Sequence, residues 1–97
     1  MIQMNLFSVK PESVQLETSA TDNKVCEGET TSINCSAVAV PSVISYQLFE
    51  NGSVVSDTSG TWNRTFSSGG VFIYKCVANN SLGPTESGSV TVTVNGK

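Results

Sequence analysis

The chain has 97 residues, a net charge of −3 and 13% charged residues, about half the fraction that is typical of a soluble domain. That length suits one domain with a single core, and the five basic residues are scattered, so the basic cluster that nucleic acids require is missing. No apolar run approaches the roughly 20 residues that span a bilayer, and we expect membrane attachment only through a longer parent chain.

Apolar and polar residues alternate along most of the chain, and this period of two predicts strands. In chain order, we expect strands at residues 13–18, 30–37, 44–50, 54–56, 61–66, 71–79 and 88–94. Asn51-Gly52 predicts a tight hairpin turn, because both residues tolerate positive φ, and residues 67–70 and 79–85 are expected loops. About seven to eight short strands predict an all-β, antiparallel Greek-key sandwich over residues 11–95, after a flexible N-terminal segment at residues 1–10.

Two of the three cysteines, Cys35 and Cys76, lie in the middle of predicted strands on the apolar face. A disulfide between them would join the two sheets and add about 4 kcal/mol of stability, whereas two buried thiols that pack as small apolar groups are the alternative. Tyr74 shares the face of Cys76, so we expect its ring in the core and its hydroxyl bonded to a backbone group at the sheet corner. Cys26 is left over, and we favour a buried or capped free thiol over a bond to another domain or to a second chain.

The segments around these cysteines resemble the immunoglobulin superfamily. Residues 27–37 (EGETTSINCSA) are similar to the segment that leads into the family's strand B, and residues 74–83 (YKCVANNSLG) are similar to strand F and the following turn of I-set and C2-like domains. By this resemblance, Leu48 takes the place on strand C where the family usually carries a core Trp. The single Trp62 is expected to fill the core from the other sheet. The family's usual Asp-x-Gly-x-Tyr sequence before strand F is missing, which implies an altered turn there.

The resemblance implies a recognition or adhesion module of a larger cell-surface receptor or adhesion protein, which acts outside the cell and binds another protein. The contact residues that we expect are Phe49 and Asn51 near the hairpin, and Asn80 and Leu82 in the loop after strand F. An intracellular structural module of a muscle-type filament is the alternative, and it would keep its cysteines reduced and carry no glycans.

Four Asn-x-Ser/Thr sequons bear on this choice, because such sites accept N-linked glycans in chains that enter the secretory pathway and not in intracellular ones. We expect glycans at Asn51, Asn63 and Asn79 if the protein is extracellular. The sequon at Asn34 adjoins the core cysteine Cys35, and it is the one that we favour least.

Enzyme chemistry finds little support in the sequence. The chain has no His, so a His-based catalytic triad or a His general base is excluded. It has neither a Cys-x-x-Cys pair for a metal nor a glycine-rich phosphate loop. We therefore expect no enzyme activity, no cofactor, no metal and no small-molecule substrate.

Overall fold

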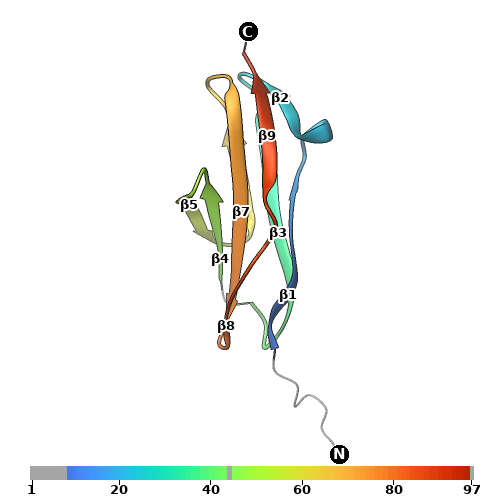
Figure 1. Cartoon of the computed structure of the whole chain (residues 1–97), viewed down its shortest axis with the longest axis vertical. Helices are drawn as coiled ribbons and strands as arrows, with labels where there is room; N and C mark the ends of the chain where they lie inside the picture. The colour runs from blue at the N-terminus through green and yellow to red at the C-terminus, as the bar shows by residue number, and fades with distance from the viewer. Residues whose placement is uncertain (1–8, 44, 97) are drawn as a thin grey trace, which may run out of the picture.

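The computed structural model describes residues 9–43 and 45–96, which form a two-layer sandwich of β-sheets (Figure 1). One sheet has three strands, in the order β1 (Val9–Thr18), β3 (Thr30–Val40) and β6 (Thr61–Thr65). The other has six, in the order β2 (Lys24–Cys26), β9 (Val90–Asn95), β7 (Gly70–Asn80), β4 (Ser45–Glu50) and β5 (Ser53–Thr58), with β8 (Gly83–Glu86) paired to β7. The all-β sandwich that the alternation predicts is confirmed, with nine strands in the described residues.

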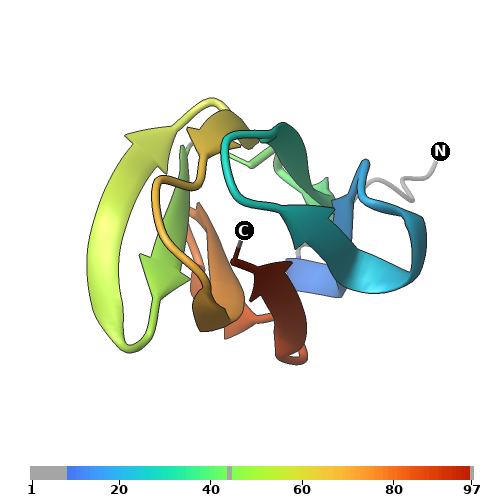
Figure 2. The same ribbon diagram turned by 90° about the horizontal axis from the view of Figure 1, so that it is seen from above.

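The strand pairs are antiparallel except for β2 and β9, which run parallel to each other. Figure 2 views the same ribbon nearly along the strands. Strand β1 begins at Val9, which pairs with Val40, so the last two residues of the expected flexible segment belong to a strand. Residues 1–8 lie outside the described residues, as does Ile44, the first residue of the third expected strand.

Two short strands, β2 and β8, are absent from the sequence prediction. Strand β8 converts most of the expected loop at residues 79–85 into a hairpin, in which Asn80 pairs with Gly83 across a two-residue turn. Gly83 has a φ of +135°, and a Cβ there would lie 3.1 Å from Cε of Lys10. A glycine therefore suits both the backbone conformation and the close approach of the Lys10 side chain. Gly83 and Pro84 are residues typical of turns, so the sequence predicts a loop here instead of a strand.

The core lies between the sheets and consists of the side chains that point inward from alternate positions of the strands. It comprises the buried residues Leu16, Val25, Ile33, Cys35, Leu48, Phe66, Tyr74, Cys76, Val92 and Val94. Cys35 on β3 and Cys76 on β7 form a disulfide with their Cα atoms 6.4 Å apart. Because these strands belong to different sheets, the expected covalent link between the two layers is confirmed.

The residues around the disulfide follow the expected arrangement. Leu48 is 2% exposed and lies directly opposite Cys76 in the β4–β7 ladder. Trp62 packs against the core from β6, on the other sheet, and its indole Nε1 is buried without a hydrogen-bond partner among the described residues. Its ring therefore stabilises the core through apolar contact.

Candidate functional site

The outer face of the six-stranded sheet carries exposed apolar side chains. Alternation along β7 turns Tyr74 and Cys76 into the core and turns Val71, Ile73 and Lys75 outward. Val71 is 58% exposed and Ile73 is 47% exposed, which is high for residues of this type on a central strand.

Phe49 and Val54 extend this surface across β4 and β5. Phe49 is half-buried and pairs with Lys75 on one side and with Val54 on the other. The Nζ of Lys75 lies 5.5 Å from the centre of the Phe49 ring and 3.4 Å from Oε1 of Glu86. We call Phe49, Val54, Val71 and Ile73 the apolar face; exposed apolar side chains that gather on one side of a sheet are typical of a protein-contact surface.

The β4–β5 hairpin is held against β7 by Asn51. Its backbone N–H donates to the carbonyl of Ile73 at 2.8 Å, and its Oδ1 accepts from the N–H of Ile73 at 2.9 Å. Asn51 has a φ of +51°, as the Asn-Gly turn predicts. This expected contact residue is exposed and borders the apolar face, but its side-chain oxygen serves the hairpin.

The other two expected contact residues lie elsewhere. Asn80 is only 5% exposed; its Nδ2 donates to the carbonyl of Pro41 at 3.1 Å and its Oδ1 accepts from the N–H of Leu82 at 2.9 Å. Asn80 thus shapes the β7–β8 hairpin and is not available for a partner, which corrects the prediction. Leu82 is 44% exposed at the tip of this hairpin. Asn80 is five residues beyond Lys75, or about 17 Å along the strand, so the four residues do not form one surface.

A polar network that sequence reasoning missed lies beneath the β4–β5 hairpin. Nε and Nη2 of Arg64 donate to the two carboxylate oxygens of Glu50 at 2.7 and 3.2 Å. The hydroxyl of Tyr74 donates to Oε1 of Glu50 at 2.5 Å. The expected backbone acceptor for Tyr74 is therefore wrong, because Glu50 pairs with Tyr74 across the β4–β7 ladder and reaches the hydroxyl from the same side. The sequence feature that could have revealed this network is the parity of Glu50, which it shares with the buried Leu48 and which places its carboxylate on the inward side of β4.

The contacts of this network shift the pKa of each member. Hydrogen bonding to Arg64 lowers the pKa of Glu50 below its ordinary value of 4.5, despite the partial burial of the carboxylate. Burial and the hydrogen bond to Glu50 raise the pKa of Tyr74, so its hydroxyl remains a donor. The guanidinium of Arg64 also lies 4.8 Å from the centre of the Phe66 ring and 5.6 Å from that of Phe72. Arg64 therefore joins the polar network to the aromatic part of the core.

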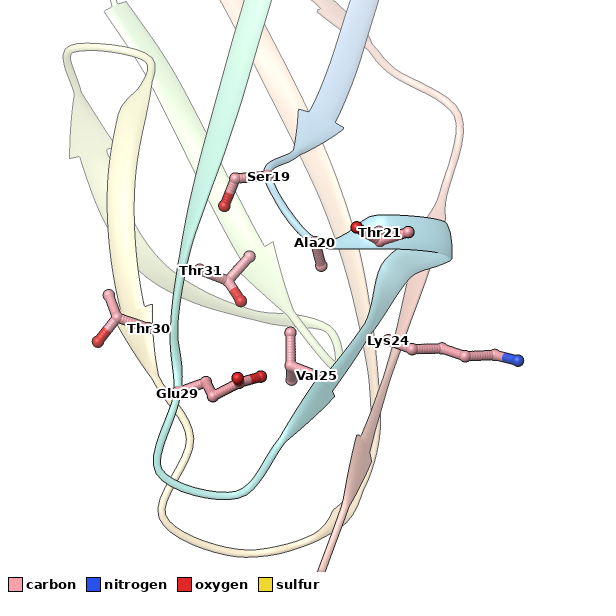
Figure 3. A pocket seen from close by; sticks show the side chains of 8 residues that line it. All are labelled: Ser19, Ala20, Thr21, Lys24, Val25, Glu29, Thr30 and Thr31. Atoms are coloured by element: carbon pink, nitrogen blue, oxygen red, sulfur yellow. The ribbon is translucent and has the colours of Figure 1, made fainter.

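A hollow of about 410 Å³ lies between the β1–β2 connection and β3 (Figure 3). The side chain of Thr31 points into this hollow towards Val25, whereas Lys24 extends away from it. Thr31 is 1% exposed, and its hydroxyl has no hydrogen-bond partner among the described residues. A buried hydroxyl without a partner lowers stability, because it loses its bonds to water on folding.

We expect the variant Thr31→Val to be more stable than the parent chain by about 1 kcal/mol, since it removes the unsatisfied hydroxyl and retains a β-branched side chain on a strand. Urea unfolding of both proteins, followed by circular dichroism, measures the difference. Thr30→Val, at the neighbouring exposed position, is the control and should not raise the unfolding midpoint, because the Thr30 hydroxyl bonds that of Thr65 at 2.7 Å. A lower midpoint for Thr31→Val would show that the hydroxyl is satisfied in solution.

Cys26 differs from the expected buried or capped thiol. It lies on β2, at an edge of the six-stranded sheet, and its side chain is exposed and free. Its backbone N–H donates to Oε1 of Glu29 at 2.8 Å, and this bond holds the turn after β2.

The sequence profile of the family described as immunoglobulin domain matches residues 12–94, which include both disulfide cysteines and most of both sheets. The chain belongs to the immunoglobulin domain family. No curated protein matches the sequence of this immunoglobulin domain.

Several solved structures share the fold of this immunoglobulin domain at low sequence identity. The PKD domain of the human VPS10 domain-containing receptor SorCS2 is 18% identical, with a TM-score of 0.71 over 99% of this chain and 83% of that one. Fibronectin(III)-like modules of Clostridium thermocellum CbhA are 16% identical, with a TM-score of 0.63 over 84% and 98% of the respective chains. A chimeric titin Z1Z2 protein is 16% identical, with a TM-score of 0.58 over 76% and 86%. At these identities the likeness concerns the fold alone.

Residues 9–43 and 45–96 contain no helix that is long and apolar enough to span a bilayer. They also contain no group of three His, Cys, Asp or Glu side chains that is close enough to hold a metal ion.

Proposed function

We propose that this immunoglobulin domain is an extracellular recognition or adhesion module of a larger cell-surface protein, with a binding rather than an enzymatic role. The partner is another protein, and it docks on the apolar face of the six-stranded sheet. The observation that carries this proposal is the exposure of Val54 on β5 and of Val71 and Ile73 on β7, at 51%, 58% and 47%, on the sheet face that also carries Phe49. Covering exposed apolar side chains with a partner makes the free energy of binding more favourable, because burial removes their surface from water.

The disulfide supports the extracellular part of the proposal. Disulfides persist in oxidising compartments and are rare in the cytosol. The sequons at Asn51, Asn63 and Asn79 suit the same location, where they are proposed glycan sites. The intracellular filament module is the rival, and it predicts reduced cysteines and unmodified asparagines in the protein isolated from its cells.

The double variant Val71→Lys/Ile73→Lys should weaken partner binding by about tenfold or more, because two charges would have to be buried in the interface. The experiment immobilises the chain and measures binding to a panel of purified cell-surface ectodomains and to the chain itself. Binding to the chain itself would identify a like copy as the partner, and sedimentation velocity would then measure the same loss.

Val38→Lys is the matched control, since Val38 is a 63% exposed valine on β3, in the other sheet. It should leave binding unchanged. Equal binding by the parent chain and the β7 double variant would contradict the proposed face, and so would an equal loss in the Val38→Lys control.

A further inference from the structure

The outer face of the three-stranded sheet has a different chemistry from the apolar face. The outward residues of β3 and β6 are all Ser, Thr or Asn along the length over which these strands pair: Thr30, Ser32, Asn34, Thr61, Asn63 and Thr65. We call this set the hydroxyl–amide face. On the same outer side but outside this set, exposed Glu17 of β1 lies opposite Asn34, and exposed Val38 lies further along β3.

Two of the four sequons lie on this face. In a strand, residues i and i+2 point to the same side, so each acceptor asparagine shares the outer side with the hydroxyl residue of its sequon. Asn34 and Ser36 are both exposed on β3, and Asn63 and Thr65 are both exposed on β6. The sequon at Asn34 is the least favoured from the sequence because Asn34 adjoins Cys35. The same alternation removes that objection. Cys35 points into the core and Asn34 points away from it.

The contacts of these asparagines leave room for a sugar. Asn63 accepts a hydrogen bond from the hydroxyl of Ser32 through Oδ1, at 3.0 Å, and this bond does not use Nδ2, the atom that would carry the glycan. Asn34 pairs with Thr61 across the ladder, and Asn63 lies two residues further along β6. The two asparagines are therefore diagonal neighbours, with Cβ atoms about 7–8 Å apart on one open surface.

We infer that Asn34 and Asn63 both carry N-linked glycans, which cover the hydroxyl–amide face on the sheet opposite the apolar face. The donor is an oligosaccharide linked to a lipid diphosphate. Nδ2 of the asparagine forms a bond to C1 of the sugar, the bond from C1 to the diphosphate oxygen breaks, and the amide loses one proton while the lipid diphosphate leaves. This inference rests on the proposed extracellular location.

A glycan on Asn63 would also protect an edge of the sheet. Strand β6 is the last strand of its sheet in the described part of the chain, so no further strand pairs with its outer edge. Side chains bond some of its backbone groups: Ser59 bonds the N–H and C=O of Thr61, and Arg64 donates to the C=O of Thr65. Unprotected edges of this kind pair readily with other chains. A bulky, hydrated group on the middle residue of β6 would hinder that pairing.

The test is site mapping of the chain secreted from eukaryotic cells behind a signal peptide. The glycans are released with peptide N-glycosidase in heavy-oxygen water, which converts each modified Asn into labelled Asp, and peptide mass spectrometry locates the label. We expect label at both Asn34 and Asn63. The variants Asn34→Gln and Ser36→Ala should each remove the Asn34 glycan, and Asn63→Gln and Thr65→Ala should each remove the Asn63 glycan. Each variant should lower the intact mass by one glycan.

The outcomes separate this inference from the proposed function. A secreted, disulfide-bonded chain with an unlabelled Asn34 or Asn63 overturns the two-glycan face and leaves the extracellular module standing. A chain that is retained in the cell with reduced cysteines overturns both. If Thr65→Ala misfolds because it loses the bond to the Thr30 hydroxyl, Asn63→Gln still decides the site.

Discussion

The double variant Cys35→Ala/Cys76→Ala is expected to lose about 4 kcal/mol of unfolding free energy, a large part of the stability of a domain of this size. The disulfide closes a loop of 41 residues in sequence separation, and opening it restores the conformational freedom of the unfolded chain. The link also joins the two sheets, and both sulfur-bearing side chains are buried, so its removal leaves space in the core as well. Urea unfolding with and without a reducing agent measures the loss, which should appear as a lower midpoint.

Cys26→Ser is the control for this prediction. Cys26 is exposed and free, and its replacement should change the unfolding free energy by no more than about 0.5 kcal/mol. Reducing agent should lower the midpoint of the parent and of Cys26→Ser to the same extent, and leave that of the double variant unchanged. A parent midpoint that is insensitive to reduction would mean that the bond adds no stability.

The second large effect is expected at Glu50. The variant Glu50→Gln should lose about 2 kcal/mol of unfolding free energy at pH 7, because Arg64 loses its carboxylate partner and Tyr74 loses a charged acceptor. The side chain of Glu50 is 15% exposed and that of Arg64 is 36% exposed, so water screens part of the charge attraction and the loss stays below that of a fully buried pair.

The contribution of the Glu50 carboxylate should also make the stability depend on pH. The folded-state pKa of Glu50 lies below 4.5, so its stabilising contribution is fully present above the unfolded-state value and is lost as the pH falls through the folded-state value. We expect the unfolding free energy of the parent chain to decline below about pH 4.5, and that of Glu50→Gln to decline less steeply over the same range. Chemical unfolding at several pH values between about 2 and 7 measures both slopes.

A double-variant cycle assigns the effect to the network. Tyr74→Phe removes only the hydroxyl and should lose about 1 kcal/mol, and its combination with Glu50→Gln should lose less than the sum of the two single effects. Glu12→Gln removes the same charge from an exposed position on β1 and should have little effect. Additive losses at Glu50 and Tyr74 would contradict a shared network.

The alternation of the sequence is sufficient to predict most strands and their inward faces. Cys35, Leu48 and Cys76 lie where parity places them, and Trp62 packs against the core from the other sheet as expected. Parity fails for β2 and β8, because strands of three or four residues are too short to show a period, and their pairing depends on β9 and β7. Parity also does not predict how deeply an inward side chain is buried.

Register explains the remaining differences. Tyr74 meets a carboxylate rather than a backbone group because the β4–β7 register sets Glu50 directly opposite, and no local pattern specifies that pairing. Asn80 resembles a loop asparagine, yet its amide reaches Pro41, which is 39 residues away in the chain. Contacts over such distances are a property of the assembled sheets, so the burial of Asn80 is visible only in the structure.

The direction of the strands has a mechanical consequence. Strand β1 starts at one end of the sandwich, while β9 ends at the other, and β9 runs parallel to β2 (Figure 1). The hydrogen bonds between β1 and β3 lie across the strands, and those between β2 and β9 link two strands that run the same way. A pull applied between the start of β1 and the end of β9 would therefore shear whole ladders at once instead of opening them one bond at a time. With the disulfide inextensible between β3 and β7, the segment between Cys35 and Cys76 would add no length until that bond is reduced.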